Sequence, residues 1–429
     1  GVSSTDSAVN NNSKVRSFVG DNSQLELANT VTIVASNITR QLADSDANVG
    51  GLIGAGAVKS DITADTGTES YIATDVTLSA TSLVISAVGN DDVFAYTNAG
   101  SGGLVAGAGT EAYATGTSDV WAGIKDKTSI NPELNLPGLV SVAATHTAQV
   151  NSETSAASGG VIAGSGSDIE NTITSTVTVS VGDDVDVLAS DLTLNALNLV
   201  RKPNLDVDAN GDEVLNLDVV TGGLIAGAGA DSDTTMSLTT TVDVGDRANL
   251  TSLAPQGLFD LQAKNDIYAR DTMLLATGGL VSGGGTDTSI SVLTDIARVS
   301  IGDAARLTAA ADMNVSARGT ADIKIVSSVE TYGVGTVATG SSKINIDPTN
   351  EVLIGAGTHI VADGDVNISA GTSVDFVRDD YKIDAGIDVF AGSAIPISAV
   401  TAEAYLDQTN LIKIESGAVV ESAGDIRLH

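Results

Sequence analysis

The chain has 429 residues and a formal net charge of −34, from 54 acidic and 20 basic residues. This charge repels nucleic acids and anionic membrane surfaces, so neither is expected as a partner. Without Cys the chain has no disulfides or thiol chemistry, and it has no apolar run of about 18 residues that could span a membrane. Aromatic residues make up only 3%, so the 42% of hydrophobic residues predict a thin core of small and β-branched side chains.

A Gly- and Ala-rich string recurs along the chain at intervals of 52 to 63 residues. It reads GGLIGAGA, GGLVAGAG, GGVIAGSG, GGLIAGAG and GGLVSGGG, starting at residues 50, 102, 159, 222 and 278, with weaker copies near residues 333 and 393. Regular self-similarity over tens of residues is typical of repeat architectures. We therefore expect residues 1–429 to form one continuous segment. Because both ends fall inside repeats, we expect it to belong to a longer protein.

Between these strings, each repeat contains about three stretches of some 18 to 20 residues that alternate apolar and polar side chains. One recurring stretch ends in Gly, as in VSVG at residue 179, and another ends in Ala, as in DLTLNA at residue 191. No window holds an apolar stripe at helical spacing. A period of about 19 residues made of short strands is typical of one coil of a parallel β-solenoid, whose coils bury apolar surface only by stacking.

The expected fold is therefore all-β, a single parallel β-helix with about 19 residues per coil and three coils per repeat. The whole chain would contain about 22 coils and form a rod on the order of 100 Å long, at the usual spacing of neighbouring strands.

The string at residue 222 alternates two kinds of face. One face holds Leu224, Ala226, Ala228 and Ala230, which we expect inside, and the other holds Ile225, Gly227 and Gly229. Two interpretations stay open. In the first, the coil narrows here and only Gly or Ala fits. In the second, the bare face is a docking strip for lateral self-association, formed by Gly223, Ile225, Gly227 and Gly229.

Two segments, VSIGDAARLTAAADMNVSA (residues 299–317) and VLIGAGTHIVADGDVNISA (residues 352–370), resemble coils of the filamentous-haemagglutinin-like large repetitive exoproteins. These are β-helical adhesins of bacteria, and the similar pattern recurs from about residue 15 to residue 429. The resemblance implies a right-handed β-helical shaft, secreted to the bacterial cell surface and used in cell adhesion or in an extracellular biofilm matrix. A host surface, a neighbouring cell or a matrix polysaccharide is the implied partner.

Few side chains suggest catalysis. The three His residues, His146, His359 and His429, are isolated along the chain and are expected in turns or on the surface. Acids such as Asp183 and Asp246 fall at equivalent turns of successive repeats, which indicates a structural role. We therefore expect no enzyme, and a structural shaft is the favoured function. The alternative is a β-helical protein that binds or cleaves polysaccharides, which would need carboxylates in a groove on one wall.

The best candidate metal motif is DVDANGDE at residues 206–213. Its oxygen ligands alternate around a Gly as at the start of a Ca²⁺ loop, and they are Asp206, Asp208, Asn210 and Asp212. The bidentate acid expected at the twelfth position is replaced by Leu217. A solvated turn accounts for the same residues, so Ca²⁺ is a candidate ligand, and no cofactor is required.

Overall fold

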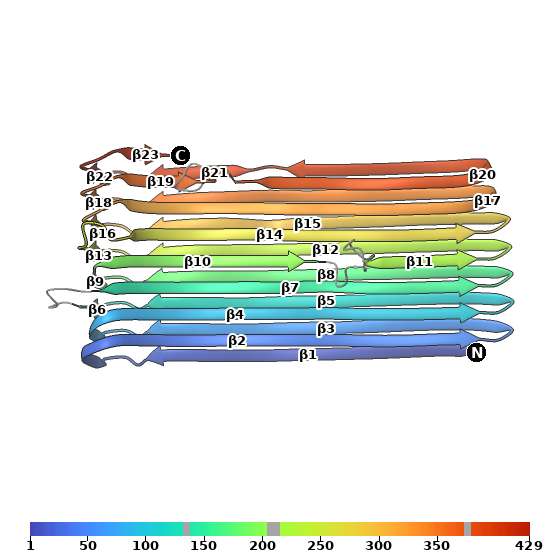
Figure 1. Ribbon diagram of the computed structural model, residues 1–429, viewed down its shortest axis with the longest axis horizontal. Helices are drawn as coiled ribbons and strands as arrows, with labels where there is room; N and C mark the ends of the chain where they lie inside the picture. The colour runs from blue at the N-terminus through green and yellow to red at the C-terminus, as the bar shows by residue number, and fades with distance from the viewer. Residues whose placement is uncertain (132–137, 204–214, 373–378) are drawn as a thin grey trace.

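A computed structural model describes residues 1–131, 138–203, 215–372 and 379–429 (Figure 1). These residues form 23 strands in one continuous sheet without a helix. Every strand pairs with its neighbours in parallel, for example β1 (Val2–Val19) with β3 (Ile53–Ile72) and β3 with β5 (Val105–Ile124). The expected all-β parallel solenoid is confirmed.

The expected coil of about 19 residues is wrong, because each repeat forms a single coil. Val2 pairs with Ala55, and Ile225 pairs with Val281, so the neighbour of a strand lies one whole repeat away. The stretches of about 20 residues are the sides of one coil. β3 runs for 20 residues without a turn, whereas strands in globular proteins average about 5–6 residues. Alternation gave the strand content correctly, but it cannot distinguish one long side from a complete short coil.

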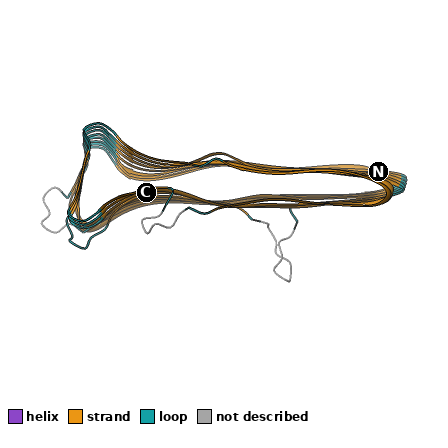
Figure 2. Cartoon of the chain, turned by 90° about the horizontal axis from the view of Figure 1, so that it is seen from above, coloured by secondary structure: helices purple, strands orange, loops and turns teal. Residues whose placement is uncertain are grey.

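Each coil has two long walls and one short side, as the view along the stacking direction shows (Figure 2). The walls meet at a narrow edge, and the short side closes the opposite, wide edge. The return wall consists of β1, β3, β5, β8 (Ile162–Val181), β12 (Ile225–Val244), β15 (Val281–Ile301), β21 (Thr409–Ile414) and the second parts of β17 (Met313–Ile354) and β20 (Tyr381–Leu406).

The outgoing wall runs from the short side to the narrow edge. It consists of β2 (Gln24–Gly50), β4 (Thr77–Gly102), β7 (Leu139–Gly159), β10 (Asp191–Lys202), β11 (Leu217–Gly222), β14 (Phe259–Gly278), β19 (Val366–Ala370), β23 (Ile426–Leu428) and the first parts of β17 and β20. The short side consists of the first residues of β2 and β4 together with β6 (Ser129–Ile130), β9 (Asp186–Ala189), β13 (Asn249–Ser252), β16 (Arg306–Ala309), β18 (His359–Ala362) and β22 (Val419–Ser422).

The stack is broad and low. Among the described residues, eight strands follow one another in the return wall, from β1 to the second part of β20. At a strand spacing of about 4.8 Å this stack is about 34 Å high, while a strand of 20 residues is about 65 Å long. The expected rod of about 100 Å is therefore wrong, and the chain forms a flat slab whose longest dimension lies along the strands (Figure 1).

The interior holds three hydrophobic clusters, which follow one another from the wide edge to the narrow edge. The cluster at the wide edge contains the short side, with Val187 and Leu250, while the cluster beside the narrow edge contains smaller side chains such as Ala108 and Ala230. A third cluster, with Val93 and others, lies between them. The cluster beside the narrow edge, where the two walls meet (Figure 2), combines these alanines with larger side chains such as Leu217 and Leu275.

Aspartates line the turns between the return wall and the short side. The amide of Asp246 donates to Asp183 Oδ1 (2.8 Å), and the amide of Asp303 donates to Asp246 Oδ1 (2.8 Å), so each carboxylate binds the backbone of the next coil. The residue that follows has a positive φ, for example 55° at Asp184 and 56° at Arg247. The expectation that these acids are structural is confirmed by this ladder of hydrogen bonds.

Candidate functional site

The narrow edge is made by the recurring Gly pair, and its second Gly is required by close packing. A Cβ on Gly160 would lie 2.6 Å from the carbonyl oxygen of Gly103, and a Cβ on Gly223 would lie 2.6 Å from that of Gly160. Real Cβ atoms do not approach backbone oxygen this closely, so successive turns can stack only if this position has no side chain. The Gly pair therefore sets the sharpness of the edge.

An aliphatic ridge runs along the narrow edge, because two large side chains follow the Gly pair in successive coils. Leu224 and Ile225 are 54% and 51% exposed. The ridge comprises Leu52, Ile53, Leu104, Val105, Val161, Ile162, Leu224, Ile225, Leu280, Val281 and Val334, each 40–75% exposed. The expected inward position of Leu224 is wrong: β12 begins only at Ile225, so Leu224 lies in the turn, where strand alternation does not yet apply.

Beside the ridge lies a glycine trough on the outer face of the return wall. Ala226 and Ala230 are buried, while Gly227 and Gly229 point outward, as alternation predicted. In the register of the sheet these glycines form two columns, Gly107–Gly164–Gly227–Gly283 and Gly109–Gly166–Gly229–Gly285. The floor of the trough is therefore bare backbone over four successive coils.

Packing explains the small residues inside but not the glycines outside. Inside, a Cβ on Gly284 would collide with the side chain of Leu275. Outside, a Cβ on Gly227 or Gly229 would meet no atom within 4 Å, and neither residue has a positive φ. Glycine within a strand costs about 0.5–1 kcal/mol relative to Ala. A Cβ on Gly285 would lie 2.8 Å from Thr339 Oγ1, so packing accounts for that one outer glycine. Gly109, Gly166, Gly227 and Gly229 have no such neighbour and lack a packing reason within the single chain.

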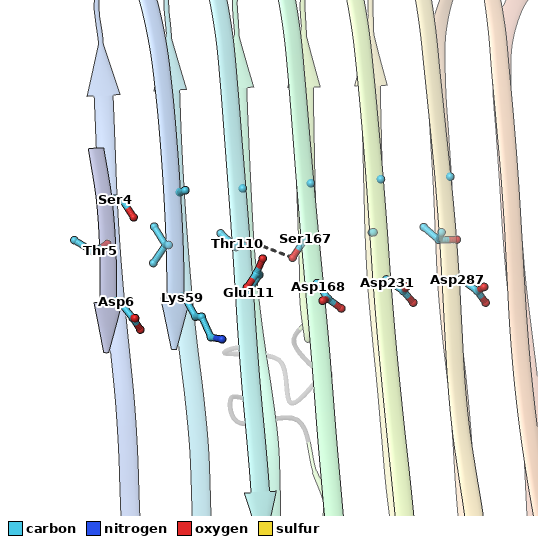
Figure 3. A pocket seen from close by; sticks show the side chains of 18 of the residues that line it. Ser4, Thr5, Asp6, Lys59, Thr110, Glu111, Ser167, Asp168, Asp231 and Asp287 are labelled. Atoms are coloured by element: carbon cyan, nitrogen blue, oxygen red, sulfur yellow. Dashed lines mark hydrogen bonds between the residues drawn. The ribbon is translucent and has the colours of Figure 1, made fainter. Parts of the chain in front are cut away.

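An acidic ladder borders the trough on the side away from the ridge, since Asp231 follows Gly229 along β12. Figure 3 shows its side chains side by side on neighbouring strands. The ladder is one column of the return wall with five acids, Asp6, Glu111, Asp168, Asp231 and Asp287, and one basic residue, Lys59, between Asp6 and Glu111. Partial burial, together with three neighbouring carboxylates, raises the pKa of Asp231 to about 6. The ladder thus concentrates negative charge beside a strip that has none.

The absence of charge from the ridge and trough is not a matter of composition. The five Gly- and Ala-rich strings contain forty residues, of which about seven would be charged at the chain's average of 17%, and none is. Large exposed apolar patches on otherwise polar proteins mark interaction sites. The narrow edge is thus the best candidate functional surface, and it includes the four residues that the sequence singled out: Gly223, Ile225, Gly227 and Gly229.

The candidate Ca²⁺ ligands Asp206, Asp208, Asn210 and Asp212 lie outside the described residues. Within the described part of the chain, no group of three or more His, Asp or Glu side chains is arranged to hold a metal ion.

A buried cluster in the middle of the slab has the composition of a catalytic triad. His146 donates from Nε2 to Asp91 Oδ2 (3.0 Å), and its Nδ1 lies 2.6 Å from Ser175 Oγ. Thr39 also donates to Asp91, and the hydrogen bonds from His146 and Thr39 outweigh the effect of burial and lower the pKa of Asp91. All three triad-like residues are at most 4% exposed, so a substrate has no access, and Ser175 donates onward to Asn198 (2.9 Å). The cluster is a structural polar layer between hydrophobic clusters.

The expected surface position of His146 is therefore wrong, since the side chain is 1% exposed. A signal for its burial was present in the sequence, because strand alternation through Val140, Val142 and Ala144 places His146 on the same, inward face. A second buried polar pair was also missed. Lys202 and Asp271 are fully buried, with Nζ and Oδ1 3.3 Å apart.

Comparisons with protein-family models, curated proteins and solved structures find no match to this chain. Helices that could cross a membrane are absent from the described residues. Function is therefore inferred from the fold and its surfaces.

Proposed function

We propose that the chain is a structural, non-catalytic segment of a secreted bacterial adhesin or extracellular matrix fibre. The observation that supports this proposal is the regular stacking of the coils, whose register shifts only at local irregularities such as Met236/Ser237 and Val292/Asp295. The Gly pairs at residues 50, 102, 159, 222 and 278 lie side by side in the sheet, and each coil repeats the same walls and edges. A structural stack needs coils that resemble one another, whereas an active site needs one that differs.

The shape refines the kind of structural role. A coil of about 55 residues adds only about 4.8 Å of height, so the chain is poorly suited to gaining length. It gains area instead, because each coil contributes two sides of up to about 65 Å to the flat walls. We therefore expect a broad blade that presents wide faces to a cell surface or matrix polysaccharide.

One observation favours the alternative function of polysaccharide cleavage. Neighbouring members of the acidic ladder, such as Asp168 and Asp231, belong to adjacent strands and are therefore about 5 Å apart at the backbone, close to the separation of the two carboxyls in retaining glycosidases. The pKa of Asp231, about 6, suits a general acid. Against this function, the ladder lies on an open wall and repeats in successive coils, so no single pair is distinguished.

The two functions are separated by incubating the purified chain with acidic and neutral glycans and measuring both binding and release of reducing ends. The structural proposal expects no release. Turnover that is abolished by Asp231→Asn, but kept in the partly exposed control Asp266→Asn on the other wall, would refute it and establish the enzyme.

A deletion tests the equivalence of the coils. Removing residues 103–159 joins Gly102 to Gly160 and removes one whole coil, because Gly102 and Gly159 are partners in the sheet. We expect the shortened chain to stay folded. A deletion of 19 residues, 103–121, should unfold it, because it removes most of β5 and leaves that coil without its return side.

A further inference from the structure

We propose that the narrow edge binds the same edge of a second copy of this chain, with the aliphatic ridge of each copy lying in the glycine trough of the other. The proposal rests on two features that the single chain leaves unexplained. The ridge exposes two large aliphatic side chains in each of five coils, and the trough omits side chains at Gly109, Gly166, Gly227 and Gly229, where a Cβ would meet no atom within 4 Å. It adds a partner to the proposed structural role, and a single blade would still exist without it.

The spacing of the surface points to a second copy as the occupant. The ridge has one step per coil and the trough one glycine per coil in each column, both at the strand spacing of about 4.8 Å. Only another solenoid presents side chains in step with this floor. Because ridge and trough lie next to each other on one chain, the edge is self-complementary, which is the condition for an interface with two-fold symmetry.

The arrangement of ridge and trough also fixes the direction of the pair. For each ridge to reach the other trough, the return walls must face each other and the slabs must extend to opposite sides. A two-fold axis parallel to the stacking direction produces this arrangement. A two-fold axis along the strands would place ridge on ridge, and a two-fold axis normal to the walls would leave both return walls facing the same way. The two stacks therefore point the same way, and each coil lies beside the equivalent coil of the partner.

The area is sufficient for association. Removing a fully exposed Leu, Ile or Val from water buries roughly 100 Å² of apolar surface, so eleven side chains at about half exposure offer about 500 Å² per copy. Two ridges thus contribute about 1,000 Å² before the backbone of the trough is counted, which reaches the lower limit for specific interfaces.

The negative charge of the chain does not oppose this contact directly. Asp231 lies six residues along β12 from Ile225, which corresponds to about 20 Å. With the two edges overlapping by about 10 Å, the acidic ladders of the two copies lie about 30 Å apart, beyond the Debye length of about 8 Å at physiological ionic strength. The charge-free width of the edge is what allows two such acidic chains to approach.

The test is the particle mass of the complete chain, measured by sedimentation equilibrium at concentrations up to about 1 mM, where even weak interfaces associate. We expect a dimer for the wild type and a monomer for Gly227→Gln, which fills the trough without a contact inside its own chain. The matched control Thr239→Gln, an outward position on the same strand, should remain dimeric. Circular dichroism should be unchanged by either substitution, and the melting temperature of the Gly227→Gln monomer should not fall, because a glycine at this strand position costs stability.

If Gly227→Gln fails to fold, Ile225→Asp tests the ridge in its place. A monomeric wild type, or a dimer that survives both Gly227→Gln and Ile225→Asp, would overturn the proposal. Loss of pairing would still leave the structural role of the single blade, whose test is the absence of glycan turnover.

Cross-linking tests the direction of the pair, and the chain is suited to it because it contains no Cys. Mixing Ile225→Cys with Gly229→Cys should give an intermolecular disulfide, because both positions lie in the same coil. Val105→Cys lies two strands away, about 10 Å along the stack, and should cross-link poorly with Gly229→Cys. Preferential cross-linking of the second pair would overturn the parallel arrangement.

Discussion

Replacing Ala228 by Leu tests where the interior of the coil ends. Ala228 packs against the hydrophobic cluster beside the narrow edge, and its register partner one coil further on, Gly284, has no space for even a Cβ because the side chain of Leu275 fills it. A Leu at 228 would add three carbons between converging walls. Overfilling a packed core costs about 1–3 kcal/mol, and we expect Ala228→Leu to destabilise the fold by this amount.

Denaturation by urea, followed by circular dichroism, gives the change in free energy of unfolding. Gly227→Gln is the matched variant, because Gly227 is adjacent in sequence but faces outward, with no atom near its Cβ. It should change the stability of the monomer by well under the cost for Ala228→Leu. If Gly227→Gln unfolds the chain while Ala228→Leu leaves its stability unchanged, the assignment of inner and outer faces is refuted.

Three further predictions concern charges. Burial raises the pKa of four carboxyls to about 6, and they are Asp231, Asp260, Asp295 and Asp379. Near this pH the folded state binds protons that the unfolded state does not, so lowering the pH from 7.5 to 5 should raise the melting temperature. An unchanged or lower melting temperature would contradict this prediction. Below about pH 4 the gain should reverse as Asp91, whose pKa is lowered, takes up a proton. Lys202→Met should cost about 3–5 kcal/mol, because it leaves Asp271 buried and unpaired, while the double variant with Asp271→Leu should recover most of the loss in urea denaturation. If the segment at residues 206–213 binds Ca²⁺, millimolar Ca²⁺ should raise the melting temperature more than Na⁺ at equal ionic strength, and equal responses would identify an ordinary turn.

The sequence predicted the type of fold because alternation and repetition are local signals. Alternation is visible within any single repeat and repetition is visible by comparing repeats, so neither needs knowledge of which strands pair, and together they indicate parallel strands that stack. The size of the coil is not local: it depends on whether a stretch such as Ile53–Ile72 closes on itself or continues as one side, and the partner that decides this lies 52 residues away, at Val105. Turn residues mark corners equally well in both cases.

The candidate surface was predicted in part. Alternation placed Gly227 and Gly229 outward correctly, because both lie within a regular strand. It failed at Leu224, which belongs to the turn, and so the ridge was not recognised. Strand alternation also contained the signal that His146 is buried. An imidazole in an apolar core requires polar partners, and here Asp91 and Ser175 come from other strands, so they are recognised only once the strands are stacked.

The width of the coil gives the chain an unusual response to pulling. If tension detaches the outermost coil, about 55 residues are released together, and at about 3.4 Å per extended residue they add roughly 190 Å of contour length. A coil of about 19 residues would release only about 65 Å. The contour length released by detaching one coil is therefore more than five times the height of the whole folded stack described for this chain. Under a sudden pulling force, such a blade would lengthen by unfolding one coil at a time while the remaining coils stay folded.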